Sequence, residues 1–378
     1  MKIAIAPDSF KGSCSAENVC RSIAEGVWRV FPQAELIQIP IADGGEGFVQ
    51  ALIGNNGGNI VKTKVLNPLG IEIDSFFGVL GDTAIIEMAA ASGLELISEQ
   101  ERNPLITTTF GTGQLIKAAL EQGFRKIVVG IGGSATNDGG VGMAQALGVS
   151  FQDKNGEEIT FGGKELDKIF RIDISAVDAR LKETSIMVAC DVDNPLCGKT
   201  GASFVFGPQK GATDEDVIKL DKCLAHYAEM VQKTLNIDIK MQKGAGAAGG
   251  LGAGLLAFTG AKMASGADIV LDTVLFDKRI KDCDLVITGE GMMDGQTVHG
   301  KAAIVVAHRA AGLGIPVFAV VGCVGNGVEA VYKHGINRIA TLMEYARDKS
   351  DAMSNARYYI AYATECVMKN IRDKNGKI

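Results

Sequence analysis

The sequence predicts an α/β fold with two domains, on three observations. Short aliphatic runs, which are typical of buried strands, alternate along the chain with longer segments whose apolar residues recur at helical spacing. Several of these runs lead into a glycine-rich loop with acidic residues and then into a helix start. One intervening stretch consists instead of short alternating runs joined by tight turns, the pattern of antiparallel hairpins.

The first fifty residues contain the strand, loop and helix pattern twice, with strands expected at 2–6 and 34–40. Because β-α-β units require parallel strands and right-handed crossovers, we expect the loops after these strands to lie at the same edge of a sheet. Two strands expected late in the chain, at 314–322 and 337–342, resemble the first two in length and setting.

The antiparallel stretch indicates where a second domain begins. Its three runs, between residues 59 and 89, are joined by an Asn-Pro-Leu-Gly turn and a Gly-Asp turn. We therefore expect a discontinuous Rossmann-like domain with a parallel sheet, formed by residues 1–58 and 265–378. The inserted mixed α/β domain is expected to span residues 59–264.

Size and composition fit two globular domains and limit the partners. The chain has 378 residues, 47% of them hydrophobic, and its 48 glycines exceed the usual share of about 7%. A net charge of −6 and a pI near 5.4 argue against binding to nucleic acid or to an anionic membrane, because both need a basic surface. The eight cysteines form no CxxC pair and are typical of reduced cytosolic thiols. No apolar run reaches the roughly 18 residues of a membrane span, so we expect a cytoplasmic protein.

The stretch 284–302, DLVITGEGMMDGQTVHGKA, is the most informative part of the chain. An aliphatic run at its start predicts a strand, and the glycines in 288–291 predict a loop with positive φ angles whose N–H groups approach a ligand. Glu290 and Asp294 in this loop suit a divalent cation. Lys301 and the free N–H groups of the following helix suit phosphate.

Similar polar residues follow other predicted strands. The five loops carry Asp8 and Lys11; Asp43 and Glu46; Asn137 and Asp138; Asp191, Asp193 and Asn194; and Glu290, Asp294 and Lys301. Because the carboxyl ends of strands in an α/β sheet face one crevice, we expect these loops to gather there. Crowded carboxylates repel each other unless a cation compensates them, and Mg²⁺ bound to nucleotide phosphates is the simplest compensation. Lys11 and Lys301 could supply the remaining positive charge.

Three glycine motifs bear on the kind of nucleotide site. The sequence GQTVHGKA at 295–302 has the glycines and lysine of a Walker A loop but lacks its metal-binding hydroxyl, and GKT at 198–200 lacks the upstream glycine. The chain is therefore not an ordinary P-loop NTPase. The run 244–249 follows a weak predicted strand, NIDIK at 236–240, and fits the G-x-G-x-x-G of dinucleotide sites. Within a Gly/Ala-rich segment, this match favours a close-packed helix or a nucleotide-facing loop over a dinucleotide site.

Taken together, the loops resemble the glycerate kinase family of bacterial glycerate and sugar-acid metabolism. The matching stretches are APDSFKGS (6–13), ADGGEG (42–47), EMAAASGL (87–94), TTTFGTG (107–113), GIGGSATNDGG (130–140), DVDNPLCG (191–198), GAGAAGGLGAGL (244–255) and TGEGMMDGQTVHGKA (288–302). They span nearly the whole chain in order. The family more often has threonine at the position of Asp193 and other residues at Met292 and Met293, so Asp193 is not treated as an obligatory ligand.

The resemblance implies ATP-dependent transfer of the γ-phosphoryl group to a hydroxyl of D-glycerate, with Mg²⁺. Members with these motifs are associated with 2-phosphoglycerate, although the residues leave open which hydroxyl reacts. The resemblance also implies two α/β domains with the active site in the cleft between them. Substrate range and oligomeric state, either monomer or homodimer, stay open.

Hypothetical roles follow from the resemblance and from the demands of phosphoryl transfer, which are mainly alignment and charge stabilisation. Asp191 would be the base that accepts the glycerate hydroxyl proton, and Lys11 would neutralise charge on the phosphoryl group or the substrate carboxylate. Glu290 and Asp294 would hold Mg²⁺, directly or through water. The substrate site is assigned to Asp8, Ser9, Asp43 and Asn194. The nucleotide site is assigned to Gly132, Gly133, Ser134, Asn137, Gly289, Gly291 and Lys301.

Two other function classes remain open from the sequence. An NAD-dependent hydroxy-acid dehydrogenase would use the glycines of 244–249 and would bind NAD in preference to ATP. A non-catalytic sugar-acid sensor of the same fold would bind glycerate without consuming ATP. The acidic charge and the lack of a recognisable DNA-binding module argue against the sensor.

Overall fold

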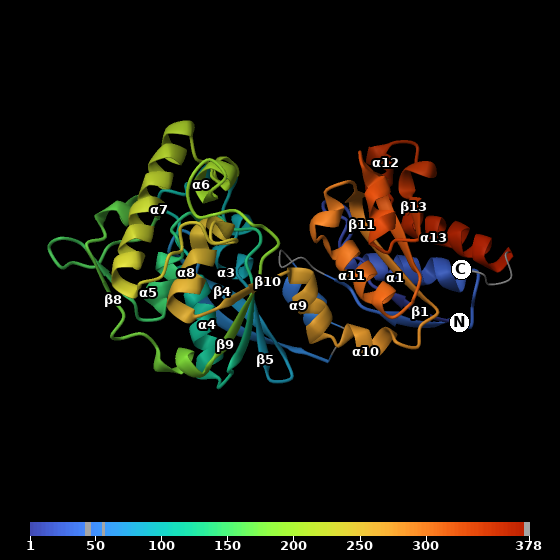
Figure 1. Ribbon diagram of the computed structural model, residues 1–378, viewed down its shortest axis with the longest axis horizontal. Helices are drawn as coiled ribbons and strands as arrows, with labels where there is room; N and C mark the ends of the chain where they lie inside the picture. The colour runs from blue at the N-terminus through green and yellow to red at the C-terminus, as the bar shows by residue number, and fades with distance from the viewer. Residues whose placement is uncertain (42–46, 55–56, 374–378) are drawn as a thin grey trace. The chain divides into compact units, whose positions relative to one another are not determined.

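The computed structural model describes residues 1–41, 47–54 and 57–373, and the chain divides into two compact units (Figure 1). The first unit comprises Met1–Asp43, Gln50–Asn56 and Ser265–Ile378, and the second comprises Gly44–Val49 and Gly57–Ala264. The chain thus passes between the units more than once before Gly57, where the sequence predicts a single boundary. Compactness alone does not establish independent folding, so the assignment of two domains stays a prediction.

A parallel five-stranded sheet forms the centre of the first unit. Its strand order is β13-β12-β11-β1-β2, and all neighbouring strands are parallel. The strands are β1 (Lys2–Ile5), β2 (Glu35–Gln38), β11 (Leu285–Met293), β12 (Val317–Val324) and β13 (Arg338–Thr341). The chain proceeds from β1 toward one edge of the sheet and from β11 toward the other. The adjacent strands β1 and β11 therefore mark the topological switch point, outside whose carboxyl ends open α/β sheets bind their ligands.

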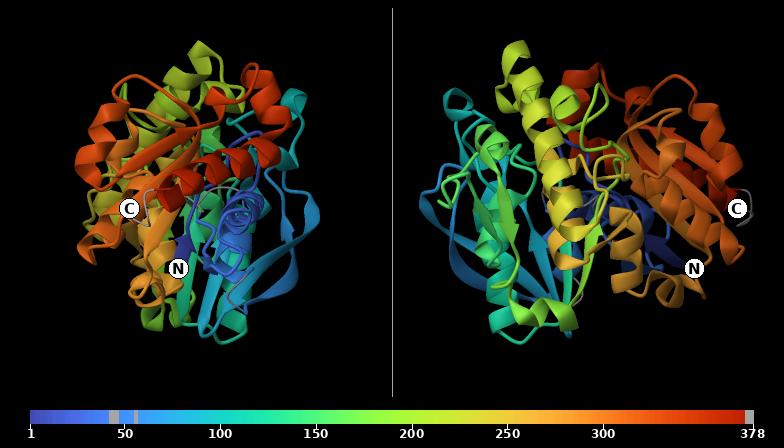
Figure 2. Two further views of the ribbon diagram at one scale, coloured as in Figure 1. Left: turned by 90° about the vertical axis from the view of Figure 1, so that its right-hand side faces the viewer. Right: turned by 60° about the vertical axis from the view of Figure 1, so that its left-hand side comes forward.

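Helices cover this sheet. They are α1 (Ala16–Trp28), α9 (Gly266–Thr273), α10 (Phe276–Ile280), α11 (Ala302–Gly312), α12 (Lys349–Ser354) and α13 (Ala356–Asp373). Ser15 accepts a hydrogen bond from the Asn18 N–H and caps α1, as the sequence predicts. Helix α13 packs beside α1, as Figures 1 and 2 show, and both contribute to one core with alternate residues of β1, β11 and β12.

A mixed six-stranded sheet forms the centre of the second unit. Its order is β10-β9-β6-β5-β4-β3, in which β5, β6, β9 and β10 are parallel and the β3–β4–β5 connections are antiparallel. The strands are β3 (Asn59–Leu66), β4 (Glu72–Leu80), β5 (Thr83–Glu87), β6 (Lys126–Gly130), β9 (Ser185–Ala189) and β10 (Lys262–Ala264), with a separate pair β7 (Ser150–Gln152) and β8 (Arg171–Asp173). One parallel and one mixed sheet confirm the predicted α/β class.

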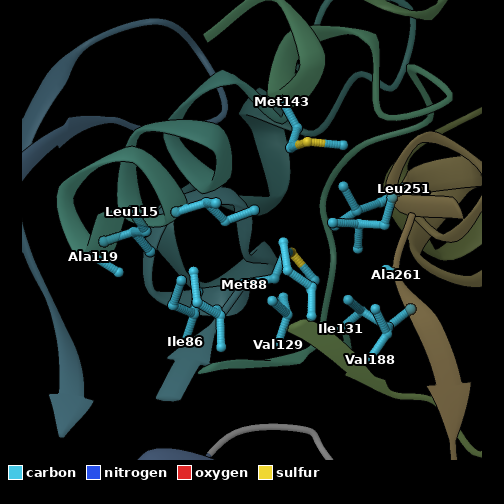
Figure 3. Close-up of a cluster of buried hydrophobic side chains, with 14 of the residues drawn as sticks. Ile86, Met88, Leu115, Ala119, Val129, Ile131, Met143, Val188, Leu251 and Ala261 are labelled. Carbon is cyan, nitrogen blue, oxygen red and sulfur yellow. The ribbon is translucent and has the colours of Figure 1, made fainter. Parts of the chain in front are cut away.

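The second unit contains two hydrophobic cores. The first is built on the parallel strands, and Figure 3 shows Ile86 of β5, Val129 of β6 and Leu115 in it. The second core surrounds Phe151, whose ring centroid lies 5.5 Å from that of Phe258. The helices are α3 (Ala89–Ser92), α4 (Phe110–Glu121), α5 (Val141–Ala146), α6 (Ala202–Phe206), α7 (Asp214–Leu235) and α8 (Leu251–Thr259), and one crossing between the units lies within α2 (Phe48–Ile53). None of the described helices combines the length and apolar character needed to cross a bilayer.

The predicted loop at 288–291 is wrong, because β11 continues through it to Met293. Glu290 pairs with Val321, and neither Gly289 nor Gly291 has a positive φ angle. The glycines serve close strand packing instead: a Cβ added at Gly289 would overlap the carbonyl oxygen of Val320. Glycine in a strand often marks such a close backbone approach. The weak strand expected just before the Gly/Ala run is also absent from the described chain, where 236–240 has no regular structure.

Gly26 tests the packing of α1 against α13. A Cβ added there would overlap the carbonyl oxygen of Ala361 in α13, so Gly26→Ala should lower the free energy of unfolding by about 1–3 kcal/mol, the usual effect of overpacking. Gly312→Ala, in open space at the end of α11, is the matched control and should be neutral or stabilise by up to about 1 kcal/mol, as alanine does in helices. Urea unfolding measures both. Equal effects of the two variants would contradict the packing described here.

Candidate active site

The loop after β1 is fastened to β11 at the switch point of the first unit. The backbone N–H of Asp8 donates to the Gly289 carbonyl oxygen at 2.8 Å, and the Thr288 hydroxyl donates to the Ala6 carbonyl oxygen at 2.9 Å. At Gly291, an added Cβ would lie 3.4 Å from the Cα of Phe10. The sequence predicts that these two segments meet, and they do so within the first unit.

Side chains of the segment after β1 are accessible to a ligand. Asp8 and Ser9 are half-buried, and Lys11 is exposed. One carboxylate oxygen of Asp8 accepts the N–H of Ser9 at 2.6 Å, which fixes the turn. An acid, a hydroxyl and an amine therefore stand together beside β11, the kinds of group that recognise a small hydroxy acid.

Glu290 of β11 is buried, with 6% of its surface exposed, and forms the centre of a polar cluster. Its carboxylate accepts hydrogen bonds from the Thr297 hydroxyl at 3.0 Å and from the Lys301 amine at 3.1 Å. The same amine lies 3.8 Å from a carboxylate oxygen of Asp294. Burial raises the pKa of Glu290, and the nearby Lys301 ammonium opposes this shift.

This cluster already compensates part of its own charge. The Lys301 ammonium stands at the start of α11 and is shared by Glu290 and Asp294, so two carboxylates face one cation. No group of three or more acidic, histidine or cysteine side chains suited to a metal occurs among the described residues. Mg²⁺ fits the cluster nevertheless, because it is usually bound through one or two carboxylates together with substrate phosphates and water.

In the second unit, the loop between β6 and α5 offers free backbone donors. The loop is held by two bonds to the segment after β5, from the Leu94 N–H to the Gly133 carbonyl oxygen and from the Ala135 N–H to the Ser92 carbonyl oxygen, each 2.9 Å. Gly133 is exposed, and its φ angle of 75° lies in the left-handed region. Within the described chain, the N–H groups of Gly132 and Gly133 donate no hydrogen bond. Neighbouring free N–H groups of this kind can bind an anion such as phosphate.

Beneath this loop lies Lys210, which sequence reasoning missed. Only 1% of its surface is exposed, and its amine donates to the Ser134 hydroxyl at 2.7 Å and to the Thr136 carbonyl oxygen at 2.6 Å. Burial lowers the pKa of Lys210 to about 7, and Asp138 opposes that shift. No pattern marks the residue: lysine is almost never fully buried, so a lysine before a polar helix start is assigned to the surface.

Asp138 and Asn137 hold the same loop from within. The Asp138 carboxylate is buried and accepts four hydrogen bonds, from the N–H and the hydroxyl of Thr109 and from the N–H groups of Gly140 and Gly142. Burial raises its pKa, and these donors oppose the shift. The Asn137 amide is fully buried and donates to the Ser203 hydroxyl at 3.1 Å. In this structure neither side chain presents surface to a nucleotide, although the sequence assigns Asn137 to that site.

The loop after β9 carries the predicted base. Asp191 is exposed at the end of the strand, and the Asn194 amide donates to the Thr200 carbonyl oxygen at 2.8 Å. Asp193 pairs with Lys243 at 3.1 Å, but about four-fifths of each side chain is exposed. Such a solvated pair contributes at most about 1 kcal/mol. Asp191 and Asn194 thus stand at the carboxyl ends of the same parallel strands as the Gly132 loop.

The Gly/Ala run packs these two loops together. A Cβ at Gly249 would overlap the Thr136 carbonyl oxygen, and one at Gly246 would overlap that of Pro195. The glycines therefore face protein backbone, which supports a close-packed helix. The G-x-G-x-x-G match at 244–249 then no longer favours an NAD site.

Glu87 makes a second contact that the sequence does not predict, with the start of α2. It ends β5, is buried, and accepts the N–H groups of Gly47 and Val49 at 3.3 Å each, at the start of α2. Glu87 begins the motif EMAAASGL (87–94), so the resemblance covers this residue but does not predict its contact with the start of α2. The predicted substrate residue Asp43 and its neighbour Glu46 lie outside the described residues.

The predicted residues thus fall into two groups. The first unit brings together Asp8, Ser9, Lys11, Gly289, Glu290, Gly291, Asp294 and Lys301, and the second brings together Gly132, Gly133, Ser134, Asn137, Asp191 and Asn194. Each group stands at the carboxyl ends of parallel strands, where the sequence predicts ligand-binding loops.

Known proteins resemble this one over nearly its whole length. The model of the Glycerate kinase family matches residues 3–372. The Glycerate 2-kinase of Escherichia coli K12 is 49% identical over 379 residues, covering 98% of this chain and all of the relative. The Glycerate kinase of Haemophilus influenzae is 50% identical over 93% of this chain and 94% of the relative. The crystal structure of a candidate glycerate kinase 2 from Salmonella typhimurium LT2 superposes with a TM-score of 0.87, at 45% identity and 99% coverage of both chains. These similarities confirm the resemblance seen in the motifs.

The buried amine of Lys210 should make stability depend on pH. Its pKa is about 7 in the folded protein and 10.5 as an ordinary lysine, so between these values the unfolded chain binds more protons. The free energy of unfolding should therefore rise with pH in this window, by up to about 1.4 kcal/mol per pH unit for one proton. Lys210→Met should lose this slope. Urea unfolding of both proteins at pH 7.5 and 9 measures the difference, and parallel pH dependences would show that Lys210 keeps its ordinary pKa.

Proposed function

Because the chain belongs to the glycerate kinase family, we propose that it transfers the γ-phosphoryl group of ATP to a hydroxyl group of D-glycerate, with 2-phosphoglycerate and ADP as products. The observation that carries this proposal is the family match across nearly the whole chain together with relatives named as glycerate kinases at about half identity. Both groups of candidate residues consist of the side chains and backbone donors that phosphoryl transfer needs for alignment and charge stabilisation.

In the first unit, we propose that Glu290 and Asp294 hold Mg²⁺, whose charge would neutralise the phosphates of the nucleotide when it is bound. The Lys301 ammonium and the first turn of α11 suit phosphate oxygens, and the phosphates would compete with Glu290 for this amine. Because Gly289 and Gly291 lie in β11, their proposed part in nucleotide binding is to let the neighbouring strands and the loop after β1 approach closely.

Four residues are proposed to bind the substrate. Asp8 and Ser9 would bind hydroxyl groups of D-glycerate, Asp43 is assigned to the same site, and Asn194 would orient the acid. The exposed ammonium of Lys11 would neutralise the substrate carboxylate or the transferred phosphoryl group.

Asp191 is the proposed general base. Its carboxylate would accept the proton of the attacking hydroxyl as the new oxygen–phosphorus bond forms and the bond from the γ-phosphorus to the bridging oxygen of ADP breaks. The side chain is exposed at the end of β9, where a bound substrate could reach it.

In the second unit, the free N–H groups of Gly132 and Gly133 would bind phosphate oxygens of ATP. Ser134 and Asn137 are proposed to act by holding this loop, since their side chains are bonded inward to Lys210 and Ser203. We further propose a cytoplasmic enzyme, a location supported by its eight free thiols.

An ATP-consumption assay on D-glycerate tests the activity, with the product identified by phosphorus NMR. We expect ATP consumption that requires both D-glycerate and Mg²⁺, is abolished by EDTA, and yields the 2-phosphate. A protein that binds glycerate without consuming ATP would support the sensor instead, and the 3-phosphate as product would overturn the proposed choice of hydroxyl.

Asp191→Asn tests the base. Loss of a general base typically lowers kcat by about 10²–10⁴-fold, and the KM values should change far less because the amide keeps the shape of the side chain. Asp193→Asn, two residues away in the same loop and paired only with a solvated lysine, is the matched control and should keep kcat within about twofold, since such pairs contribute little. A kcat of Asp191→Asn within about tenfold of wild type, under ~1.4 kcal/mol of barrier, would rule out this role.

A further inference from the structure

Lys210 is a charged group for which the proposed reaction has no direct use. Among the described residues it is the one lysine whose side chain is fully buried. Burying an ammonium is unfavourable unless hydrogen bonds and an opposite charge compensate it. Its presence therefore calls for a role that an apolar side chain of similar size would not fill.

The amine is positioned by a rigid segment. Lys210 ends a short 3-10 helix, Pro208–Lys210, and the next residue, Gly211, has a φ angle of 92° and closes the turn with a bond to the Pro208 carbonyl oxygen at 3.0 Å. A Cβ added at Gly211 would overlap the Arg102 carbonyl oxygen, so the backbone here is closely packed. The long side chain thus reaches the loop after β6 from a fixed base.

The two bonds of the amine span the inner side of that loop. They end at the Ser134 hydroxyl and the Thr136 carbonyl oxygen, on either side of the buried Ala135. The free N–H groups of Gly132 and Gly133 come directly before Ser134, on the more exposed part of the loop. A lysine that fixes Ser134 therefore limits the movement of these donors.

The same loop is fastened a second time by the buried Asp138 carboxylate, which is bonded to Thr109 and to the start of α5. Asp138 favours the protonated form of the Lys210 amine, against the effect of burial. Without the amine, the Ser134 hydroxyl and the Thr136 carbonyl oxygen would each lose a buried hydrogen-bond partner, which is unfavourable.

On the basis of the function proposed above, we propose that Lys210 is a positioning residue for the nucleotide: it holds Ser134 and Thr136 so that the N–H groups of Gly132 and Gly133 stay arranged for the phosphates of ATP. Lys210 itself touches no substrate in this proposal. The Ser134 hydroxyl acts as its acceptor rather than as a ligand of the nucleotide.

The test compares Lys210→Met, Ser134→Ala and the double variant with Gln209→Ala, a control at the exposed neighbouring position. Five quantities are measured on the full chain: the KM for ATP, the KM for D-glycerate, kcat, the Kd for ADP by calorimetry, and the midpoint of thermal unfolding. Lys210→Met should raise the KM for ATP and the Kd for ADP by about tenfold or more, the loss expected when two buried hydrogen bonds are removed together. The KM for D-glycerate should stay within about twofold, because the substrate site draws no donor from this loop.

The remaining variants test whether Lys210 acts through Ser134. Ser134→Ala removes one of the two acceptors and should weaken ADP binding by about threefold to fivefold, and the double variant should bind ADP no worse than Lys210→Met, because both changes disrupt the same contact. Gln209→Ala should behave as wild type. If Lys210→Met does not fold, the ADP affinity of Ser134→Ala alone tests the proposal.

Two outcomes would overturn the proposal: a folded Lys210→Met with unchanged ADP affinity and only a lower unfolding midpoint, or a Ser134→Ala that binds ADP as tightly as wild type. Failure of the proposed function is distinguishable, because it would appear as wild-type protein that consumes no ATP with D-glycerate, whereas ADP binding would still report on Lys210.

Discussion

The pairing of β1 with β11 is the constraint on which the first group of candidate residues depends. These strands come from opposite ends of the chain, and their ladder continues beyond β1 through the bond from the Asp8 N–H to the Gly289 carbonyl oxygen. That bond places the segment of Asp8 and Lys11 against the strand that carries Glu290. The glycines at 289 and 291 allow the approach, since any side chain at Gly289 would overlap the next strand. The acids and lysines of the two motifs can serve one ligand only because this backbone contact exists.

The second unit reaches a similar result through buried polar groups rather than strand pairing. Its loop after β6 is fixed by the Asp138 carboxylate, which accepts four donors, and by the Lys210 amine, which donates to two acceptors. A buried polar network is favourable only when its members are satisfied, and most of these are. The network leaves the N–H groups of Gly132 and Gly133 unpaired in the more exposed part of the described loop, which is the property that a phosphate site requires.

Much of this arrangement could be predicted from the sequence, where local patterns determine it. Tight turns between 59 and 89 give the antiparallel edge, and repeated strand, loop and helix patterns give the parallel strands. The extension of β11 could not be predicted, because Gly289 and Gly291 read as loop residues until the neighbouring strand is known. Lys210 was missed because its role depends on a tertiary contact 76 residues away in sequence, with Ser134. The burial of Asn137 could not be predicted, because burial inside a glycine-rich loop leaves no mark on the loop's own sequence.

The position of β1 also has a consequence for biosynthesis. Residues 2–5 leave the ribosome long before their partner strand, which begins at Leu285, so the β1–β11 pair of the first sheet cannot form until the long stretch between them has been made. The strands of the six-stranded sheet, by contrast, all lie within 59–264 and can pair earlier during translation. The aliphatic KIAI segment, which pairs with β2 on its other side, must therefore remain without β11 during synthesis, and we expect chaperones that shield nascent chains to raise the yield of folded protein.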